Sequence, residues 1–238
     1  MIDCISVENM RQSDAYTIEN LVPSLELMYR AAYGVFLAAD WQGSTAIVVG
    51  SGNNGGDGFA LAWILKNHGY ACEVFTVSQR YSPDSTYYAQ KAAQTGVAVK
   101  PFCAGCLQGF RTVVDCLLGT GFQGALREDY RAAIEEINAS QAFVISVDIN
   151  SGMNGDTGLA ELAVKSHLTV TIGYVKTGLI QPCAANYIKR LICTDIGIEL
   201  VRQEGKICTA EEYASLAPVP DGYFLCPDWL DLTIFQSK

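Results

Sequence analysis

A glycine-rich nonapeptide constrains this chain more than any other segment. Residues 50–58 read Gly-Ser-Gly-Asn-Asn-Gly-Gly-Asp-Gly, with five glycines in nine positions, and they follow the apolar run Thr45–Val49. Residues 59–66 then have the spacing of an amphipathic helix. Glycine tolerates positive φ and lets a ligand approach the main chain, and a helix N-terminus offers unpaired N–H groups to phosphate. The order of strand, glycine turn and helix therefore predicts a nucleotide or dinucleotide ligand.

The first interpretation to test is the dehydrogenase fingerprint G-x-G-x-x-G, which Gly50, Gly52 and Gly55 satisfy formally. That fingerprint also requires an acid about 20 residues further on, at the end of the second strand, to hold a ribose hydroxyl. The second predicted strand, 72–77, is followed by Ser-Gln-Arg, and Glu73 lies at its start. Because the expected acid is missing, an ordinary dehydrogenase is disfavoured.

The composition argues against two classes of partner. The net charge of −9 and the lack of any basic run longer than two residues disfavour nucleic acid. No apolar stretch approaches the roughly 18 residues that span a bilayer, and the N-terminus lacks a signal-peptide pattern, so no membrane association is expected. Half of the 238 residues are hydrophobic, which supports a large buried core.

Nine cysteines are scattered along the chain without the spacing of a disulfide framework. This usage indicates reduced thiols that pack as small hydrophobic side chains, and it predicts a cytoplasmic protein. Cys103-Ala-Gly-Cys106 is a C-x-x-C pair, but no second pair or histidine cluster accompanies it. A plain loop is the favoured interpretation, with a zinc or redox role as the alternative.

Apolar strands alternate with helical patterns along the chain. Helices are predicted at 7–19, 24–40, 57–68, 83–95 and 127–138, and strands at 45–50, 72–77, 111–116, 142–148, 167–173 and 190–194. This alternation predicts an α/β fold with a doubly wound, mostly parallel sheet and helices on both faces, a Rossmann-like three-layer sandwich. Residues 1–238 are expected to form a single domain with its core over 7–200.

Two further strand ends lead into loops that are rich in glycine and polar groups, residues 115–124 and 148–158. Ligands of such sheets bind beyond the carboxyl ends of the strands, so the three loops are expected to form one cleft. For residues 154–156, ordinary turn chemistry is the favoured interpretation. Asp115 and Asp148 are different, because an aspartate at the end of an apolar parallel strand is desolvated and needs a partner or a function.

Three motifs carry a resemblance to a known family. Residues 50–58 match G-x-G-N-N-G-G-D-G, residues 115–121 match D-x-L-x-G-T-G, and residues 146–152 are similar to S-[VI]-D-I-P-S-G. With shorter agreements elsewhere in 7–200, the chain resembles the NAD(P)H-hydrate epimerase family, also called the YjeF N-terminal domain family. Members of this family epimerise the R and S forms of hydrated NADH and NADPH at C6 of the nicotinamide ring. A separate ATP- or ADP-dependent dehydratase then repairs the S form.

The resemblance implies a dinucleotide site with a bound potassium ion. The residues implied in substrate binding are Asn53, Asn54, Gly55, Gly56, Asp57, Gly119, Thr120, Gly121, Phe122, Gln123, Gly124, Ala125 and Asp148. The implied K⁺ ligands are Asn54, Asp115 and Ser151, hard oxygen donors that suit a weakly polarising cation. Asp148 is the residue expected to be catalytic. Asp57 is the rival, although an acid in the first turn of a helix is often only a cap or a dipole partner.

The sequence departs from the family pattern at three notable places. Asn150 replaces the proline of the D-I-P-S-G segment, Tyr29 replaces an acid, and His167 replaces the acid before a predicted strand. None of these positions belongs to the implied site. His167 suggests a general base, but at the start of a strand, opposite the cleft, a structural role is favoured. The alternative function is a non-catalytic metabolite-binding or protein-interaction module of the same fold.

The tail over 201–238 shows no pattern of a dehydratase domain. It contains the segment Ala-Pro-Val-Pro-Asp at 217–221 and a few aromatic residues after it. The tail is expected either to cover an edge of the sheet or to contribute to a homodimer contact.

Overall fold

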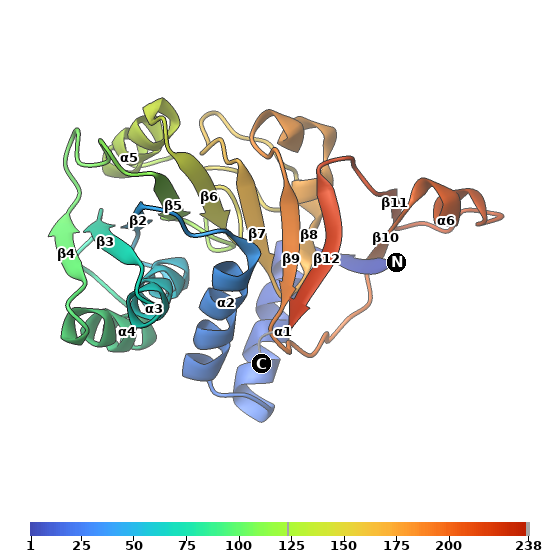
Figure 1. Cartoon of the computed structure of the whole chain (residues 1–238). Coiled ribbons are helices and arrows are strands. Elements are labelled where there is room, and N and C mark those ends of the chain that lie inside the picture. Colours follow the sequence, from blue (N-terminus) through green and yellow to red (C-terminus); the bar gives the residue numbers. More distant parts are fainter. Residues whose placement is uncertain (123, 237–238) are drawn as a thin grey trace.

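Eight parallel strands form the central sheet (Figure 1). The computed structural model describes residues 1–122 and 124–236. The strand order across the sheet is β12-β9-β7-β6-β5-β2-β3-β4. The strands are β2 (Ser44–Val49), β3 (Ala71–Thr76), β4 (Ala98–Pro101), β5 (Thr112–Cys116), β6 (Phe143–Val147), β7 (Leu168–Ile172), β9 (Leu191–Asp195) and β12 (Leu230–Gln236).

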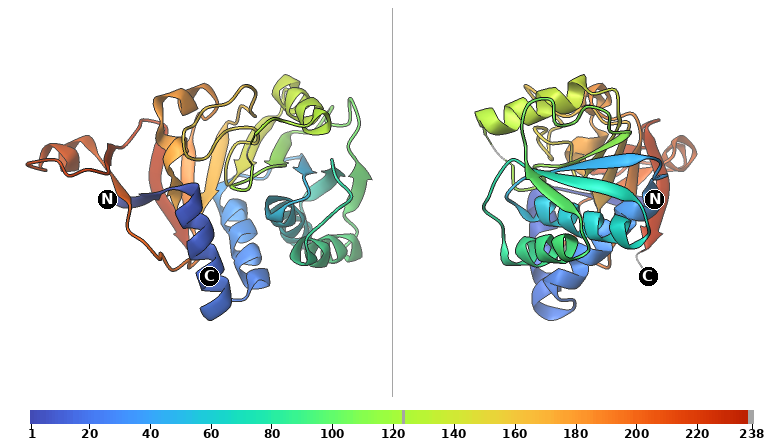
Figure 2. Two further views of the ribbon diagram at one scale, coloured as in Figure 1. Left: turned by 180° about the vertical axis from the view of Figure 1, so that it is seen from behind. Right: turned by 60° about the vertical axis from the view of Figure 1, so that its left-hand side comes forward.

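Helices cover both faces of this sheet, as Figures 1 and 2 show. One face carries α1 (Val7–Asn20), α2 (Ser24–Ala38), α3 (Asn53–Asn67) and α4 (Pro83–Gln94), and the other carries α5 (Glu128–Ala139). Strand β2 shows how the two cores are separated, because alternate side chains of a strand point to opposite faces. Ile47 packs into the core under the four helices and Val48 into the core under α5. The three-layer α/β fold predicted from the sequence is confirmed.

The described termini add a second, smaller sheet with the order β11-β10-β1-β8. Its strands are β1 (Ile2–Ile5), β8 (Val175–Lys176), β10 (Gly205–Cys208) and β11 (Tyr223–Leu225), and α6 (Ala210–Ala214) connects the last two. Two 3₁₀ turns, η1 (Thr177–Ile180) and η2 (Pro182–Asn186), follow β8. The tail thus completes this sheet, and its last strand, β12, covers the β9 edge of the main sheet. The sequence patterns did not predict β1, β4, β8 or the strands of the tail.

Helix α3 begins four residues earlier than the predicted helix at 57–68. The carbonyl of Gly52 accepts hydrogen bonds from the N–H groups of Gly55 and Gly56, at 3.0 and 3.3 Å, so helical bonding starts inside the glycine segment. Glycine has low helix propensity, and tertiary packing overrides it here. A Cβ on Gly56 would lie 2.6 Å from Met28 of α2, which shows how closely the helices approach. The first three residues of the nonapeptide are therefore turn and the other six are helix.

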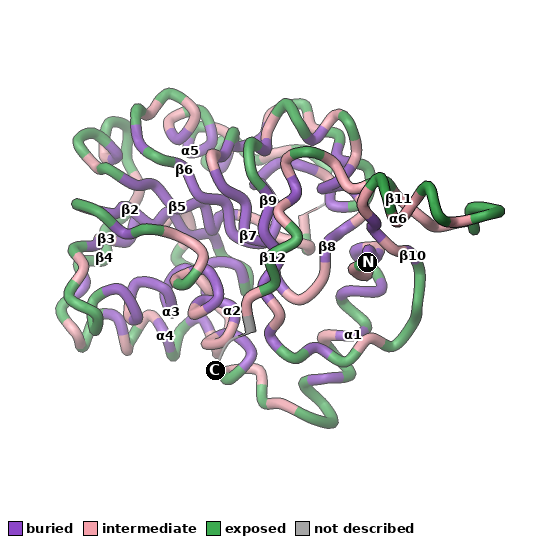
Figure 3. The backbone as a smooth tube through the Cα atoms, turned by 45° about the vertical axis from the view of Figure 1, so that its right-hand side comes forward, coloured by how far each residue is buried: buried purple, intermediate pink, exposed green. Residues whose placement is uncertain are grey.

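The chain reverses its direction of winding at β2. Strand β3 pairs with one side of β2, and β5, which follows later in the chain, pairs with the other side. Such a switch point leaves a crevice at the carboxyl ends of the two strands. Figure 3 shows the buried strands that lead to it. The glycine segment after β2 and the loop after β5 both start at this crevice.

All nine cysteines have free thiol groups in the structure. Cys103 and Cys106 lie in the turn region after β4, where the Cys106 N–H donates to the Cys103 carbonyl at 3.1 Å. Among the described residues, no helix has the length and apolar character needed to cross a bilayer.

Gly50 offers a test of the switch-point packing. A Cβ at this position would lie 2.0 Å from the carbonyl oxygen of Leu117, in the loop after β5. We expect Gly50→Ala to lower the free energy of unfolding by about 3 kcal/mol, because two backbone segments would have to separate. Urea unfolding measures this loss. The control is Gly121→Ala, where a Cβ meets no atom within 4 Å, and equal stability of the two variants would contradict the packing argument.

Candidate functional site

A cavity of about 650 Å³ lies at the carboxyl ends of β2, β5 and β6. It is bounded by α1, α2, the first turns of α3 and the loops after β5 and β6. The residues of the predicted site that line it are Asn53, Asn54, Asp57, Gly119, Thr120, Gly121, Phe122, Ala125 and Asp148. The structure therefore brings most of the predicted site residues together at the expected edge of the sheet.

Three residues of the predicted substrate-binding set are placed differently, and one lies outside the described residues. Gly55 and Gly56 are buried in α3 behind the cavity wall. A Cβ on Gly55 would lie 2.3 Å from the Gly50 carbonyl oxygen, so this glycine permits close packing of helix and turn. Gly124 is not among the lining residues, and Gln123 lies outside the residues that the structure describes.

Asp115 is the penultimate residue of β5, and its side chain is fully buried. Its Oδ1 accepts hydrogen bonds from Ser151 Oγ at 2.5 Å and from the Leu117 N–H at 3.2 Å. Its Oδ2 accepts from Ser146 Oγ at 2.9 Å and from the Ser151 N–H at 3.0 Å. Burial raises the pKa of Asp115, and the hydrogen bonds, those from Ser151 first, act against the rise. This carboxyl group connects the loop after β5 to the loop after β6.

Asn54 reaches the same place from α3. Its Nδ2 donates to the Leu118 carbonyl at 2.9 Å, and the Leu118 N–H donates to Ser151 Oγ, also at 2.9 Å. The side-chain oxygen of Asn54 is buried, yet it has no hydrogen-bond partner among the described residues. Buried acceptors are normally satisfied, so this oxygen is able to accept a further ligand. An unpaired amide oxygen next to the loops that hold a buried carboxyl group and a hydroxyl is a donor set that fits a hard cation.

Asp148 follows β6 and has a φ of 68°, in the left-handed region that non-glycine residues rarely adopt. Its Oδ1 accepts from the ammonium group of Lys176 at 2.5 Å and from the Ile172 N–H at 3.4 Å. The other oxygen, Oδ2, faces the loop after β5, since a Cβ on Gly119 would lie 3.2 Å from it. The side chain is thus anchored at one oxygen and directed into the cavity with the other.

Two more carboxyl groups share the cavity with Asp148. Asp57 lies in the second turn of α3, so the expectation of a first-turn cap or dipole partner is wrong: the helix starts at Asn53. Burial raises the pKa of Asp57 well above its usual value, and Asp148 and Asp14 add to the rise. Burial and Asp148 also raise the pKa of Asp14, which α1 contributes. Burial and mutual repulsion therefore favour the neutral forms of Asp57 and Asp14 in this cavity.

Sequence reasoning missed several residues of this cavity. The clearest are Arg11 and Asp14 of α1, Met28 of α2, and Lys176 of β8. Lys176 lies in a Lys-Thr-Gly-Leu segment that agrees with the family, but no local pattern places that segment beside Asp148. The pairing that brings it there joins Ile5 and Lys176, which are distant in the chain.

The structure explains two of the departures from the family pattern. Asn150 is fully buried, and its Nδ2 donates to the Val164 carbonyl at 2.9 Å and to Ser166 Oγ at 3.0 Å. Its Oδ1 accepts from Thr169 Oγ1 at 2.7 Å. These bonds fix the loop after β6, which a proline would fix through its ring. Tyr29 stacks on Tyr33, with ring centroids 5.8 Å apart, and packs in the α2 core.

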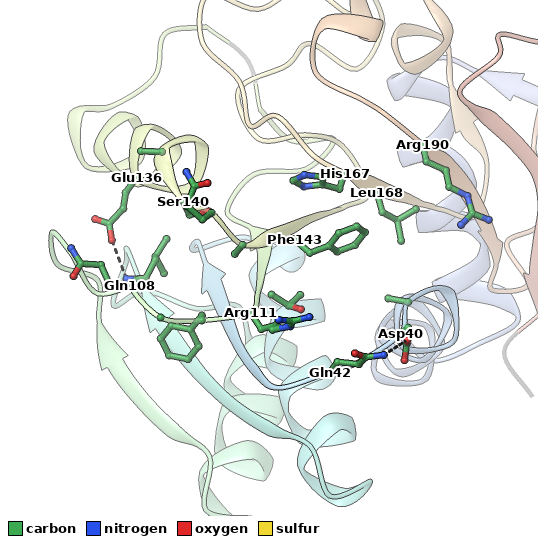
Figure 4. Close-up of a pocket in the computed structure, with 18 of the residues that line it drawn as sticks. Asp40, Gln42, Gln108, Arg111, Glu136, Ser140, Phe143, His167, Leu168 and Arg190 are labelled. Carbon is green, nitrogen blue, oxygen red and sulfur yellow. Dashed lines mark hydrogen bonds between the residues drawn. The ribbon is translucent and has the colours of Figure 1, made fainter.

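His167 lies at the opposite edge of the sheet, as expected. Its Nδ1 accepts the Val144 N–H at 3.0 Å, and its ring stacks on Phe143 at 5.0 Å between centroids. It lines a wider cavity of about 1200 Å³ at the amino ends of the strands, with Arg111 and Arg190 (Figure 4). None of the predicted site residues lines this cavity. Its larger volume therefore does not make it the candidate site.

The fold and the cavity at the switch point define a doubly wound α/β protein with its candidate site at the carboxyl ends of the strands. The profile of the family described as "YjeF-related protein N-terminus" matches residues 24–178. The chain belongs to this family.

Named relatives agree with that assignment. A protein of Lentilactobacillus buchneri named NAD(P)H-hydrate epimerase is 34% identical over 206 residues, covering 83% of this chain and 96% of its own length. A protein of the same name from Limosilactobacillus fermentum is 35% identical over 201 residues, covering 80% and 95%. The bifunctional NAD(P)H-hydrate repair enzyme Nnr of Archaeoglobus fulgidus is 37% identical over 175 residues, covering 72% of this chain but 37% of the relative.

A solved structure supports the fold. The crystal structure of the yeast protein YNL200c superposes with a TM-score of 0.66 at 22% sequence identity, covering 78% of this chain and 84% of the yeast chain. At this identity the similarity shows a shared fold and says nothing about the chemistry of the site.

The raised pKa of Asp57 predicts how stability depends on pH. The folded protein holds this proton more tightly than the unfolded chain, whose carboxyl group titrates near 3.8. The contribution of Asp57 to the free energy of unfolding should therefore be fully present below that pH and should be lost as the pH rises through the folded-state pKa. Asp57→Asn should remove this loss, so that the variant gains stability relative to wild type as the pH rises above about 3.8.

Urea unfolding midpoints at several pH values measure the effect. Asp221→Asn, at an exposed residue of the tail, is the control and should follow wild type at every pH. A constant difference between Asp57→Asn and wild type across the range would show that Asp57 titrates normally in the folded protein.

Proposed function

We propose that this chain is an NAD(P)H-hydrate epimerase, an isomerase that interconverts the R and S forms of hydrated NADH and NADPH. The observation that carries the proposal is the free oxygen of Asp148, held in a cavity at the switch point of the sheet. The epimerase relatives, which align over nearly their whole length, name the same reaction. The substrate is accordingly a small molecule.

The dinucleotide would lie across the carboxyl ends of β2, β5 and β6. Its phosphates would meet two backbone segments, the start of α3 and the loop at 119–122 and 124–125. A helix N-terminus carries a partial positive charge and unpaired N–H groups, which favour phosphate. The nicotinamide end would then reach Asp148, Asp57 and Asp14 at the depth of the cavity.

The chemistry requires two proton transfers. C6 of the hydrate carries a hydroxyl group, and inversion breaks the C–O bond and re-forms it on the other face of the ring. A proton must reach the departing hydroxyl, and a proton must leave the incoming water. Asp57, whose pKa is raised, would donate the first proton, and the carboxylate form of Asp148 would accept the second. Two carboxyl groups whose environments differ in this way are a common basis for acid and base roles.

A potassium ion would be held by Asn54, Asp115 and Ser151. The unpaired Asn54 oxygen supports this, and so does the hydrogen-bonded pair of Asp115 and Ser151. When bound, the ion supplies positive charge that offsets the buried Asp115 carboxylate. The three residues themselves connect α3 with the loops after β5 and β6, which carry the substrate-facing groups.

A separate dehydratase would consume the S form. The bifunctional relatives, of which this chain spans 37–40%, are named as repair enzymes for the same compound. We propose that the epimerase formed by this chain acts together with a dehydratase that is a separate partner.

Conversion of chemically prepared R-hydrate by the purified protein tests the proposed function. We expect Asp148→Asn to lower kcat by about 100-fold or more while calorimetry shows unchanged binding of the hydrate, because the base is lost and the shape is kept. Asp221→Asn should retain the wild-type rate. Wild-type turnover in Asp148→Asn together with inactivity in Asp57→Asn would move the central role to Asp57, and an inactive wild type would refute the function.

The potassium site is tested by stability. We expect K⁺ to raise the thermal unfolding midpoint of wild type relative to choline at equal ionic strength, since a ligand that binds only the folded state stabilises it. Asn54→Leu should lose this K⁺ dependence, because it removes the unpaired oxygen. An equal response to K⁺ in the variant and wild type would exclude Asn54 as a ligand.

A further inference from the structure

Lys176 is a fully buried lysine that the acid and base roles leave unassigned. Its ammonium group donates to Asp148 Oδ1 at 2.5 Å, to the Ile172 carbonyl at 2.6 Å and to Thr171 Oγ1 at 3.2 Å. An ammonium group has three N–H donors, and here all three are used. Lys176 therefore has no proton left to donate to a substrate, and its role must act through its partners.

The bond from Lys176 to Asp148 determines which oxygen of this carboxyl group is free. Oδ1 is occupied by the ammonium group and by the Ile172 N–H. Oδ2 has no hydrogen-bond partner among the described residues and lies next to Gly119, where a Cβ would be 3.2 Å from it. Asp148 also has a positive φ, an unfavourable conformation that persists only where neighbours hold it. The ion pair is one of those restraints.

We propose that Lys176 is the positioning residue for the base: it anchors Asp148 through Oδ1 so that Oδ2 alone faces the reacting carbon. This inference rests on the proposed epimerase function. The charge of Lys176 also balances the one acid that must stay ionised next to Asp14 and Asp57. Burial disfavours the charged form of a carboxyl group that has no cation beside it. A protonated carboxyl group cannot act as the base.

The second, smaller sheet holds Lys176 in the position that this role requires. Strand β8 places Lys176 by pairing with β1, where Ile5 lies opposite Lys176, and β1 in turn pairs with β10 of the tail. The N-terminal strand and the tail are therefore parts of the support that holds the ammonium group at the cavity. The neighbouring pair of this ladder, Cys4 and Val175, is buried in the core beside β8.

Two properties separate a positioning role from a merely structural one. Loss of positioning lowers kcat and leaves KM nearly unchanged, because the dinucleotide contacts lie on other elements. Loss of positioning also has no further effect once the base is gone. A double-mutant cycle between Lys176 and Asp148 measures this dependence directly.

The experiment uses Lys176→Met, Asp148→Asn and the double variant, assayed with R-hydrate beside wild type. We expect Lys176→Met to lower kcat by about 100-fold with KM changed less than about threefold. The double variant should be no slower than Asp148→Asn alone. The matched control is Lys100→Met, which removes a lysine paired with Glu73 on the far edge of the sheet and should keep the wild-type rate.

A second measurement covers the case in which Lys176→Met folds poorly. In Lys176→Ala, added ethylammonium should restore part of kcat, because the cavity reaches this position, whereas the same concentration of propanol should not. The double variant lacks both buried charges and gives a further folded reference.

The outcomes decide between the two proposals. Wild-type kcat in Lys176→Met, or a double variant much slower than Asp148→Asn, would overturn the positioning role and leave the epimerase function standing. Equal restoration of Lys176→Ala by propanol and ethylammonium would also overturn it, since filling space would then suffice. An inactive wild type would remove the epimerase function and the inference with it.

Discussion

The geometry of the site depends on the buried carboxyl group of Asp115. It accepts four hydrogen bonds, from two side chains and two backbone N–H groups, and they join the end of β5 to the loop after β6. Without these bonds, the carboxyl ends of neighbouring strands would carry independent loops. Because Ser151 also contacts Leu118, to which Asn54 of α3 donates, three elements are fixed relative to one another. The cavity wall is a consequence of this network.

Charge in the cavity is arranged at a cost to stability. Asp14, Asp57 and Asp148 share one space with a single buried ammonium group, that of Lys176. The pKa values of Asp14 and Asp57 are raised mainly by burial, and Asp148 adds to both. A fold selected for stability alone would replace such groups by apolar ones. Retaining them makes sense where one acid must give a proton and a neighbouring one must accept it.

The sequence predicted the sheet and the edge of the site, but not the parts that depend on long-range pairing. Apolar strands and glycine loops are local signals, so β2, β5, β6 and the residues after them could be placed. The start of α3 was missed because packing against Met28 makes glycines helical despite their low propensity. Lys176 was missed because only the pairing of β8 with β1, across most of the chain, brings it to Asp148.

Asn150 shows which property of the loop after β6 matters. A proline would fix this position by restricting φ, whereas Asn150 reaches the same end with hydrogen bonds to Val164, Ser166 and Thr169. Its neighbours in the chain, Asp148 and Ser151, keep their contacts with Lys176 and Asp115. The site therefore requires a rigid loop and does not require a particular residue to make it rigid. The absence of the family proline is thus compatible with the activity that Asp148 is proposed to perform.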